Sequence, residues 1–166
     1  MAQLKAGTTI DGRDILQEID DLANKARGGG ALVNLNTTQL IPNESYTKVS
    51  FNNVIYDTDG FYNNNLPTRL TVPSGVSKVK VIANIEWGQT GTGRRVVEIW
   101  KNGVDGNHGL PKDSRAGSAD PSVNLSSSVI EVAQGDYFEV LVFHNGGLNM
   151  SIQGSHSTWF SIEVIE

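Results

Sequence analysis

The sequence predicts an all-β domain of short antiparallel strands from about residue 31 to the C-terminus. Apolar and polar residues alternate with a period of two, most clearly between Val79 and Trp87. Turn-forming pairs such as Asn102-Gly103 and Gly135-Asp136 separate these runs. No helical period lies between them, which favours a sandwich or jelly roll over a parallel α/β sheet.

The same alternation recurs later in the chain. The apolar stripes are Val97 and Ile99; Ile130 and Val132; Phe138, Val140 and Val142; and Phe160, Ile162 and Val164. Ile82 is out of phase with its strand, where a polar residue would be expected. The tryptophans Trp87, Trp100 and Trp159 also fall in strand patterns, where packing in the core or against another subunit is the ordinary role of a large ring.

The composition of the chain excludes several classes of partner and of site. The net charge of −5 leaves no broad basic surface for a nucleic acid or an anionic membrane. Cysteine is absent, so disulfides and thiolate metal sites are excluded. The N-terminus has neither the apolar run of a signal peptide nor a membrane span, so we expect a protein made in a cytoplasm without a secretory signal of its own.

One segment, residues 13–27, predicts a short α-helix. Its apolar residues Ile15, Ile19, Leu22 and Ala26 form a heptad seam. Asp11 or Asp14 can cap its start, and residues 28–30, three glycines, end it. A helix this short needs a packing partner, which is either its own β domain or copies of itself from other chains. A flexible glycine tether favours the second alternative.

Two long polar segments, Asp57 to Pro67 and Gly103 to Asn124, predict surface loops that carry function. Aromatic rings beside Asn and Asp are suited to stacking on a sugar or docking on a protein, but local packing under the loop is the favoured interpretation for Tyr56, Phe61 and Tyr62. The candidate receptor-binding residues are Tyr56, Asp57, Asp59, Phe61, Tyr62, Asn64, His108, Lys112 and Arg115.

No pattern indicates a metal ion or cofactor. The histidines His108, His144 and His156 lack the spacing of metal ligands. The run from Asp57 to Gly60 resembles the opening of a calcium loop, but no acidic residue follows at its far end, so a turn with Asx hydrogen bonds is favoured. The glycine-rich run Gly91 to Arg95 lies between two strands and is interpreted as a hairpin loop rather than a phosphate cradle.

Catalysis is also not indicated. No serine lies in a nucleophile elbow between a strand and a helix. A polysaccharide-cleaving enzyme would need two carboxylates facing each other across a groove. The loop carboxylates Asp57, Asp59, Asp113 and Asp120 show no spacing that pairs them, so we expect no enzyme and keep glycan cleavage as a remote alternative.

Several motifs carry a resemblance to known families. The runs Val49 to Phe51, Leu70 to Val76, Gly135 to Val140 and Ser157 to Ile162 resemble the jelly roll of complement globular heads and tumour necrosis factor, across nearly all of residues 31–166. The shorter runs are similar to this domain in tailed-bacteriophage structural proteins: Tyr56 to Phe61, Pro67 to Pro73 and Lys101 to Gly103. Residues Leu4 to Gly12 resemble the opening of phage fibre proteins.

The resemblance implies a homotrimer on the virion surface. Residues 1–12 would attach to other virion proteins, residues 13–27 would form a trimeric coiled coil, residues 28–30 would be the linker and residues 31–166 the jelly-roll head. The expected role is a fibre or spike that binds a glycan or protein of the host surface; the alternative is a capsid decoration protein that stabilises the particle. The chain departs from the animal family at Gly75 to Val79, which lacks the usual aromatic residues, and in having no collagen-like stalk.

Overall fold

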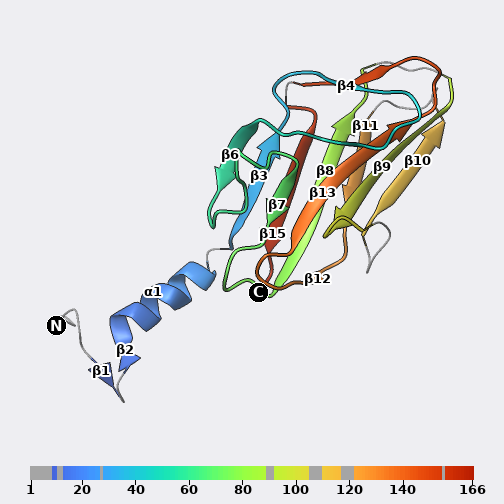
Figure 1. Cartoon of the computed structure of the whole chain (residues 1–166). Helices are drawn as coiled ribbons and strands as arrows, with labels where there is room; N and C mark the ends of the chain where they lie inside the picture. Colours follow the sequence, from blue (N-terminus) through green and yellow to red (C-terminus); the bar gives the residue numbers. More distant parts are fainter. Residues whose placement is uncertain are drawn as a thin grey trace.

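The computed structural model describes residues 9–10, 13–26, 28–88, 92–104, 110–116, 122–154 and 156–166. From residue 29 onwards the chain forms two β-sheets that pack face to face, and an α-helix leads away from one end of them (Figure 1). Every strand pair among the described residues is antiparallel, as the sequence predicts.

The first sheet has six strands. In order across the sheet they are β11 (Ser122–Ser126), β8 (Lys78–Glu86), β15 (Trp159–Val164), β3 (Gly30–Asn34) and β6 (Asn53–Asp57), and β12 (Ile130–Glu131) pairs with β8. The second sheet has five strands. In order they are β10 (Lys112–Ala116), β9 (Arg94–Lys101), β13 (Tyr137–His144) and β5 (Thr47–Lys48), and β7 (Arg69–Thr71) also pairs with β13.

The chain crosses repeatedly between the two sheets, which is the jelly-roll arrangement. Strand β8 lies in the six-stranded sheet and β9, which begins at Arg94, lies in the other, so the connection between them crosses from one sheet to the other. The expectation of a hairpin loop there is wrong, because a hairpin joins neighbours of one sheet. Gly91 itself lies outside the described residues. A short pair, β4 (Gln39–Ile41) with β14 (Met150–Ile152), lies at one end of the sandwich (Figure 1).

The core lies between the sheets and follows the predicted alternation. In β8 the residues Val79, Val81, Ala83 and Ile85 are buried, whereas their neighbours are only half-buried. From the opposite sheet, Phe138, Val140 and Val142 of β13 meet them in the same apolar cluster. Alternation puts every second side chain on the same face of a strand, so each sheet also has an outward face.

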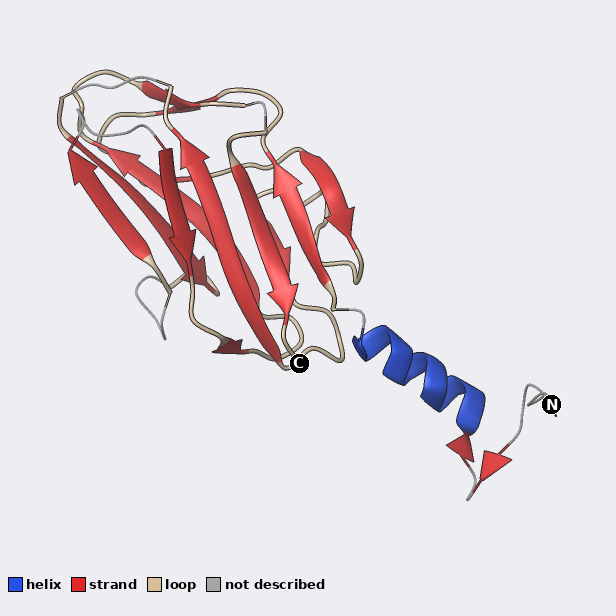
Figure 2. Ribbon diagram, turned by 180° about the vertical axis from the view of Figure 1, so that it is seen from behind, coloured by secondary structure: helices blue, strands red, loops and turns tan. Residues whose placement is uncertain are grey.

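The predicted helix is α1 (Ile15–Ala26), which follows a small hairpin of β1 (Thr9–Ile10) and β2 (Arg13–Asp14). The Asp14 carboxylate caps it by accepting hydrogen bonds from the backbone N–H groups of Leu16 and Gln17. Helix α1 projects away from the sandwich (Figures 1 and 2). Two seam residues are exposed, Ile19 at 48% and Leu22 at 61%; the side chain of Ala26 lies outside the described part.

The glycines at the junction do not form the expected flexible linker. Gly30 is the first residue of β3, and its N–H donates to the Thr58 hydroxyl. Gly29 accepts a backbone hydrogen bond from Val164. A Cβ on Gly30 would lie 2.2 Å from the carbonyl oxygen of Ile162, so glycine is required by close approach of the backbones. The head therefore begins at Gly29, and of the three glycines only Gly28 lies outside it.

The second long segment is only partly a loop. Strand β10 and the start of β11 both fall between Gly103 and Asn124, where the sequence predicts a continuous polar connection. Strand β10 has no apolar alternation by which the sequence could have predicted it, because its half-buried positions, Asp113 and Arg115, are charged and form an ion pair with each other. Among the residues that the structure describes, no helix has the length and apolarity needed to cross a membrane.

Candidate functional site

The first predicted loop is closed by the Asp57 carboxylate. Its Oδ1 accepts hydrogen bonds of 2.9 Å from the backbone N–H groups of Gly60 and Phe61, and its Oδ2 accepts one of 2.9 Å from that of Tyr62. This is the Asx-type turn favoured over a calcium loop. Within the described part of the chain, no cluster of three or more His, Asp or Glu side chains could hold a metal ion.

The aromatic residues of this loop fasten it to the head. Phe61 is buried, with 1% of its surface exposed, so its prediction as a receptor-binding residue is wrong. Tyr62 is half-buried and its hydroxyl donates a 2.6 Å hydrogen bond to the carbonyl oxygen of Phe51. For both rings the structure supports the interpretation that the sequence favours, local packing under the loop.

The remaining loop candidates do not converge on one site. Asp59 Oδ2 accepts hydrogen bonds from Gly30 N–H and from the Thr58 hydroxyl, which ties the loop to β3. Asn64 is exposed at the turn. Tyr56 is exposed as well, but it belongs to β6 and lines a hollow on the outward face of the six-stranded sheet.

The candidates of the second segment are also dispersed. Lys112 and Arg115 lie on β10 rather than in a loop. Lys112 forms an ion pair with Glu98, and Arg115 forms one with Asp113. Neighbouring side chains on a strand point to opposite faces. Lys112 and Arg115 are three positions apart, so they lie on opposite faces of β10. His108 and Asp120 lie outside the described residues.

The structure instead brings apolar side chains together on the outward face of the six-stranded sheet. They surround a hollow of about 490 Å³. Its lining residues, contributed mainly by β3, β6, β8 and β15, are Leu32, Asn34, Ile55, Tyr56, Ile82, His156, Trp159, Ser161 and Glu163. We call this surface the sheet hollow.

Strand register explains why these residues share a face. Ser161 of β15 lies between Leu32 of β3 and Ile82 of β8. Two residues earlier on β15, Trp159 points to the same side, whereas Phe160 points into the core. Large apolar side chains therefore lie on both faces of the central strands, and only one face is covered by the second sheet.

Polar groups border the hollow at one end. Asn34 is buried, and its amide nitrogen lies 3.3 Å from Nδ1 of His156. The Asn34 amide oxygen accepts a 2.8 Å hydrogen bond from Asn53. His156 has a φ of 57°, a left-handed conformation that is uncommon for a residue with a side chain. Asn34 and His156 therefore form a polar rim, while the large apolar side chains of the lining are Leu32, Ile55, Ile82 and Trp159.

Sequence reasoning missed most of this surface. The sequence indicates this surface at two positions. Ile82 and Trp159 are apolar at strand positions where the alternation would place a polar residue if that face were exposed to solvent. Ile55 and Leu32 lie in continuous apolar runs, Val54 to Tyr56 and Ala31 to Val33, where periodicity alone does not say which side chain points outward.

Comparison with solved structures identifies the fold as a tumour-necrosis-factor-like jelly roll. Murine APRIL aligns with a TM-score of 0.56 at 13% identity, covering 82% of this chain and 99% of that one. Eiger TNF from S. frugiperda aligns with a TM-score of 0.56 at 10% identity, covering 84% and 93%. No family model and no curated protein sequence matches the chain. Identities this low show the fold alone, which confirms the predicted fold class; the similarity to phage proteins stays a prediction.

Proposed function

We propose that this chain is a structural protein of a bacteriophage virion, a homotrimeric fibre or spike whose jelly-roll heads attach to a host surface. The observation that carries the self-association part of the proposal is the sheet hollow. It places Trp159, Tyr56 and Ile82 on a sheet whose other face already packs in the core. A contiguous apolar patch of this kind on a soluble domain marks an interaction surface.

A second copy of the chain is the occupant that best fits this surface. The patch continues onto edge strand β6, where Val54, Ile55 and Tyr56 are all exposed. Fully burying a large apolar side chain contributes about 1.5–3 kcal/mol, so a few such residues can hold a subunit interface. In a cyclic trimer each head would cover the hollow of its neighbour, and the ring would close without leaving a patch exposed.

Helix α1 supports the same assembly. Ile19 and Leu22 are exposed on the helix, at the spacing of a coiled-coil seam. Because Gly29 is already fixed in the head, the helix, which ends at Ala26, ends close to the edge of the sandwich at which β3 starts (Figure 1). Three heads and three helices would then share one axis.

The virion assignment rests on the sequence motifs in residues 4–12, 56–61, 67–73 and 101–103. Residues 1–12 would contact other virion proteins, and the chain would be located at the virion surface. No chemistry on a substrate is part of the proposed role. A capsid decoration protein would use the same trimer, and depletion of the protein from particles separates the two: loss of adsorption supports a fibre, and loss of mechanical stability supports decoration.

The self-association can be tested by measuring molar mass in solution. Sedimentation equilibrium should give three times the chain mass of 17.9 kDa. Ile82→Lys places a charge in the sheet hollow and should shift the protein towards monomer, while its circular dichroism stays unchanged. Leu148→Lys, at a position 82% exposed outside the hollow, is the matched control and should remain trimeric. A wild-type monomer at micromolar concentration would contradict the proposal.

A further inference from the structure

The outward face of the five-stranded sheet carries a second aromatic surface, which the self-association proposal does not use. Trp100 of β9 and Phe143 of β13 lie on this face, because Val97, Ile99 and Val142 beside them point into the core. Tyr46, just before β5, lies against both rings. We call Tyr46, Trp100 and Phe143 the aromatic face.

The three rings form one continuous surface. The Tyr46 ring centroid is 4.9 Å from that of Phe143, with an angle of 32° between the planes. It is 6.2 Å from that of Trp100, with an angle of 39°. Tyr46 is 44% exposed, and the other two rings are half-buried. Ring faces that are tilted but adjacent can follow the puckered outline of a sugar better than a flat patch can.

A buried carboxylate holds these rings in place. Glu98 is 3% exposed. Its Oε1 accepts a 2.8 Å hydrogen bond from the Tyr46 hydroxyl, and its Oε2 accepts one of 2.8 Å from Trp100 Nε1. Lys112 Nζ lies 2.5 Å from Glu98 Oε1. The polar edges of both rings are therefore fixed towards the sheet, which orients the rings before any ligand arrives and reduces the entropy lost on binding.

Charge is segregated on this face. The carboxylates of Glu98 and Glu139 are buried, whereas the side chains of their cationic partners, Lys112 and Lys48, remain 56% and 48% exposed. The guanidinium of Arg94 lies 5.8 Å above the centre of the Phe143 ring. Among the described residues, no carboxylate lies within ion-pair distance of Arg94. Lys112, Lys48 and Arg94 therefore place three cationic groups on this face, on a chain whose net charge is −5.

From this arrangement we infer that the aromatic face binds an acidic glycan. The C–H faces of a pyranose would stack on Tyr46 and Trp100, and a carboxylate or phosphate of the sugar would lie near Arg94 and Lys112. The inference rests on the proposed host-attachment role and names its ligand class. It also relocates the expected host-binding surface from the loop aromatics to this sheet.

The position of the face in the molecule agrees with such a role. The sheet hollow and the aromatic face lie on opposite sides of the sandwich, because each is the outward face of a different sheet. A trimer that buries the hollow would leave all three aromatic faces open. A cationic ligand is disfavoured by Lys112 and Arg94, and a long nucleic acid is disfavoured by the overall negative charge.

Binding can be measured with the purified full-length protein. The probes are polygalacturonate oligosaccharides, which carry carboxylates, teichoic-acid-type poly(glycerol phosphate) bearing glucose, which carries phosphates, and carboxyl-reduced polygalacturonate as the neutral counterpart. Isothermal titration should show binding of at least one charged probe, weakened at high salt. The neutral probe should bind about tenfold or more weakly.

Four variants separate a binding role from a structural one. Arg94→Gln should weaken binding of the charged probe about tenfold and leave the weak binding of the neutral probe unchanged. Tyr46→Ala should weaken both, and Tyr46→Phe, which keeps the ring but loses the bond to Glu98 that orients it, should weaken binding less than Tyr46→Ala does. Lys78→Gln removes a cation from the other sheet, where Lys78 pairs with Glu166, and should have no effect.

Two outcomes would contradict the inference that the aromatic face binds an acidic glycan. If neither charged probe binds the folded wild-type protein, or if binding of the charged probe survives both Arg94→Gln and Tyr46→Ala, the inference is wrong. That outcome is independent of the proposed assembly, because a trimeric mass and loss of particle adsorption on depletion would still support the virion role. Conversely, a protein that binds the glycan but is monomeric would support the aromatic face as the binding site and contradict the proposed trimer.

Discussion

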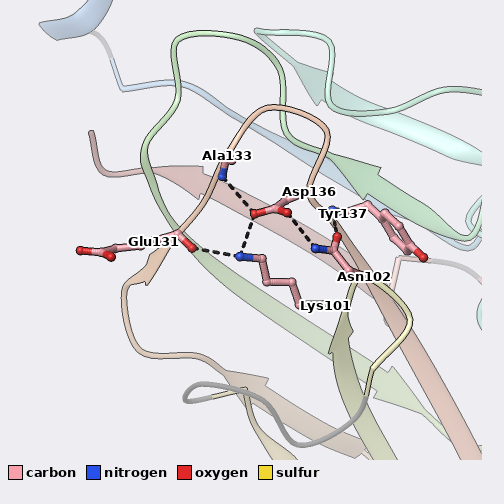
Figure 3. A network of polar contacts seen from close by, with 6 residues as sticks. All are labelled: Lys101, Asn102, Glu131, Ala133, Asp136 and Tyr137. Carbon is pink, nitrogen blue, oxygen red and sulfur yellow. Dashed lines mark hydrogen bonds and ion pairs between the residues drawn. The ribbon is translucent and has the colours of Figure 1, made fainter.

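Lys101 Nζ lies 2.7 Å from Asp136 Oδ2, which joins the end of β9 to the turn that precedes β13 (Figure 3). The same carboxylate accepts hydrogen bonds from the Asn102 side-chain amide at 2.7 Å and from Ala133 N–H at 3.0 Å. Asn102 in turn accepts a bond from the Tyr137 N–H. One half-buried carboxylate therefore fixes two turns of the second sheet.

Asp136→Ala should destabilise the head by about 1–3 kcal/mol, because it leaves several donors without their acceptor. Urea unfolding followed by circular dichroism measures the change. The matched control is Glu131→Gln: Glu131 contacts Lys101 through its backbone carbonyl, which a side-chain change does not remove. An equal loss of stability in both variants would show that the network contributes little.

Glu98 makes the stability depend on pH. Burial alone raises the pKa of Glu98, but the hydrogen bonds from Lys112, Trp100 and Tyr46 outweigh it and hold the pKa below the ordinary value of 4.5. A carboxyl whose pKa is lowered by folding stabilises the protein above its unfolded pKa, and this contribution is lost as the pH falls through the folded pKa. The wild-type free energy of unfolding should therefore decrease on acidification below about pH 5.

The variant Glu98→Gln isolates that contribution. It should be less stable than wild type at neutral pH, and the difference should shrink as the pH is lowered, because the wild-type carboxyl is then protonated as well. Urea titrations at a series of pH values measure both curves. Parallel curves, with a constant difference at every pH, would contradict the assigned role of Glu98.

Gly30→Ala should destabilise the head severely, by several kcal/mol, because the new Cβ would lie 2.2 Å from the backbone oxygen of Ile162 and φ is +154°. Gly28→Ala is the control. It also has a positive φ, of +64°, but no atom lies within 4 Å of its Cβ position, so only the conformational cost of about 1–2 kcal/mol should appear. Thermal unfolding of both variants distinguishes close approach from backbone conformation.

Phe61 and Tyr62 should differ in what they contribute. Phe61→Ala removes a buried ring and should cost about 3–5 kcal/mol. Tyr62→Phe removes only the hydroxyl that bonds Phe51 and should cost about 1 kcal/mol. If Phe61→Ala left stability unchanged and abolished adsorption of particles, the original prediction of a receptor-binding ring would be correct after all.

These residues also show where sequence reasoning succeeds and fails. The alternation of β8 depends on local periodicity and was predictable, including the out-of-phase position of Ile82. The burial of Phe61 depends on its contact with the core and on the bond from Thr71 N–H to its carbonyl, ten residues away along the chain. The sequence predicts that Gly30 is part of a linker, because the residue that requires a glycine there, Ile162, is far away along the chain. Contacts of that kind are set by how the sheets pair.

The last prediction concerns the two regions proposed to hold the assembly together. The double variant Ile19→Ser, Leu22→Ser removes the two exposed apolar side chains of the helix and leaves the head unchanged. Burying each of these side chains in a coiled coil would contribute about 1–2 kcal/mol per chain, so the variant should require a higher concentration to remain trimeric. Analytical ultracentrifugation over a dilution series measures the shift.

Because the sheet hollow persists, we expect a weakened trimer rather than a monomer, and adding Ile82→Lys should complete the dissociation. An unchanged assembly in the double variant would mean that the helix seam packs elsewhere and that the heads associate alone.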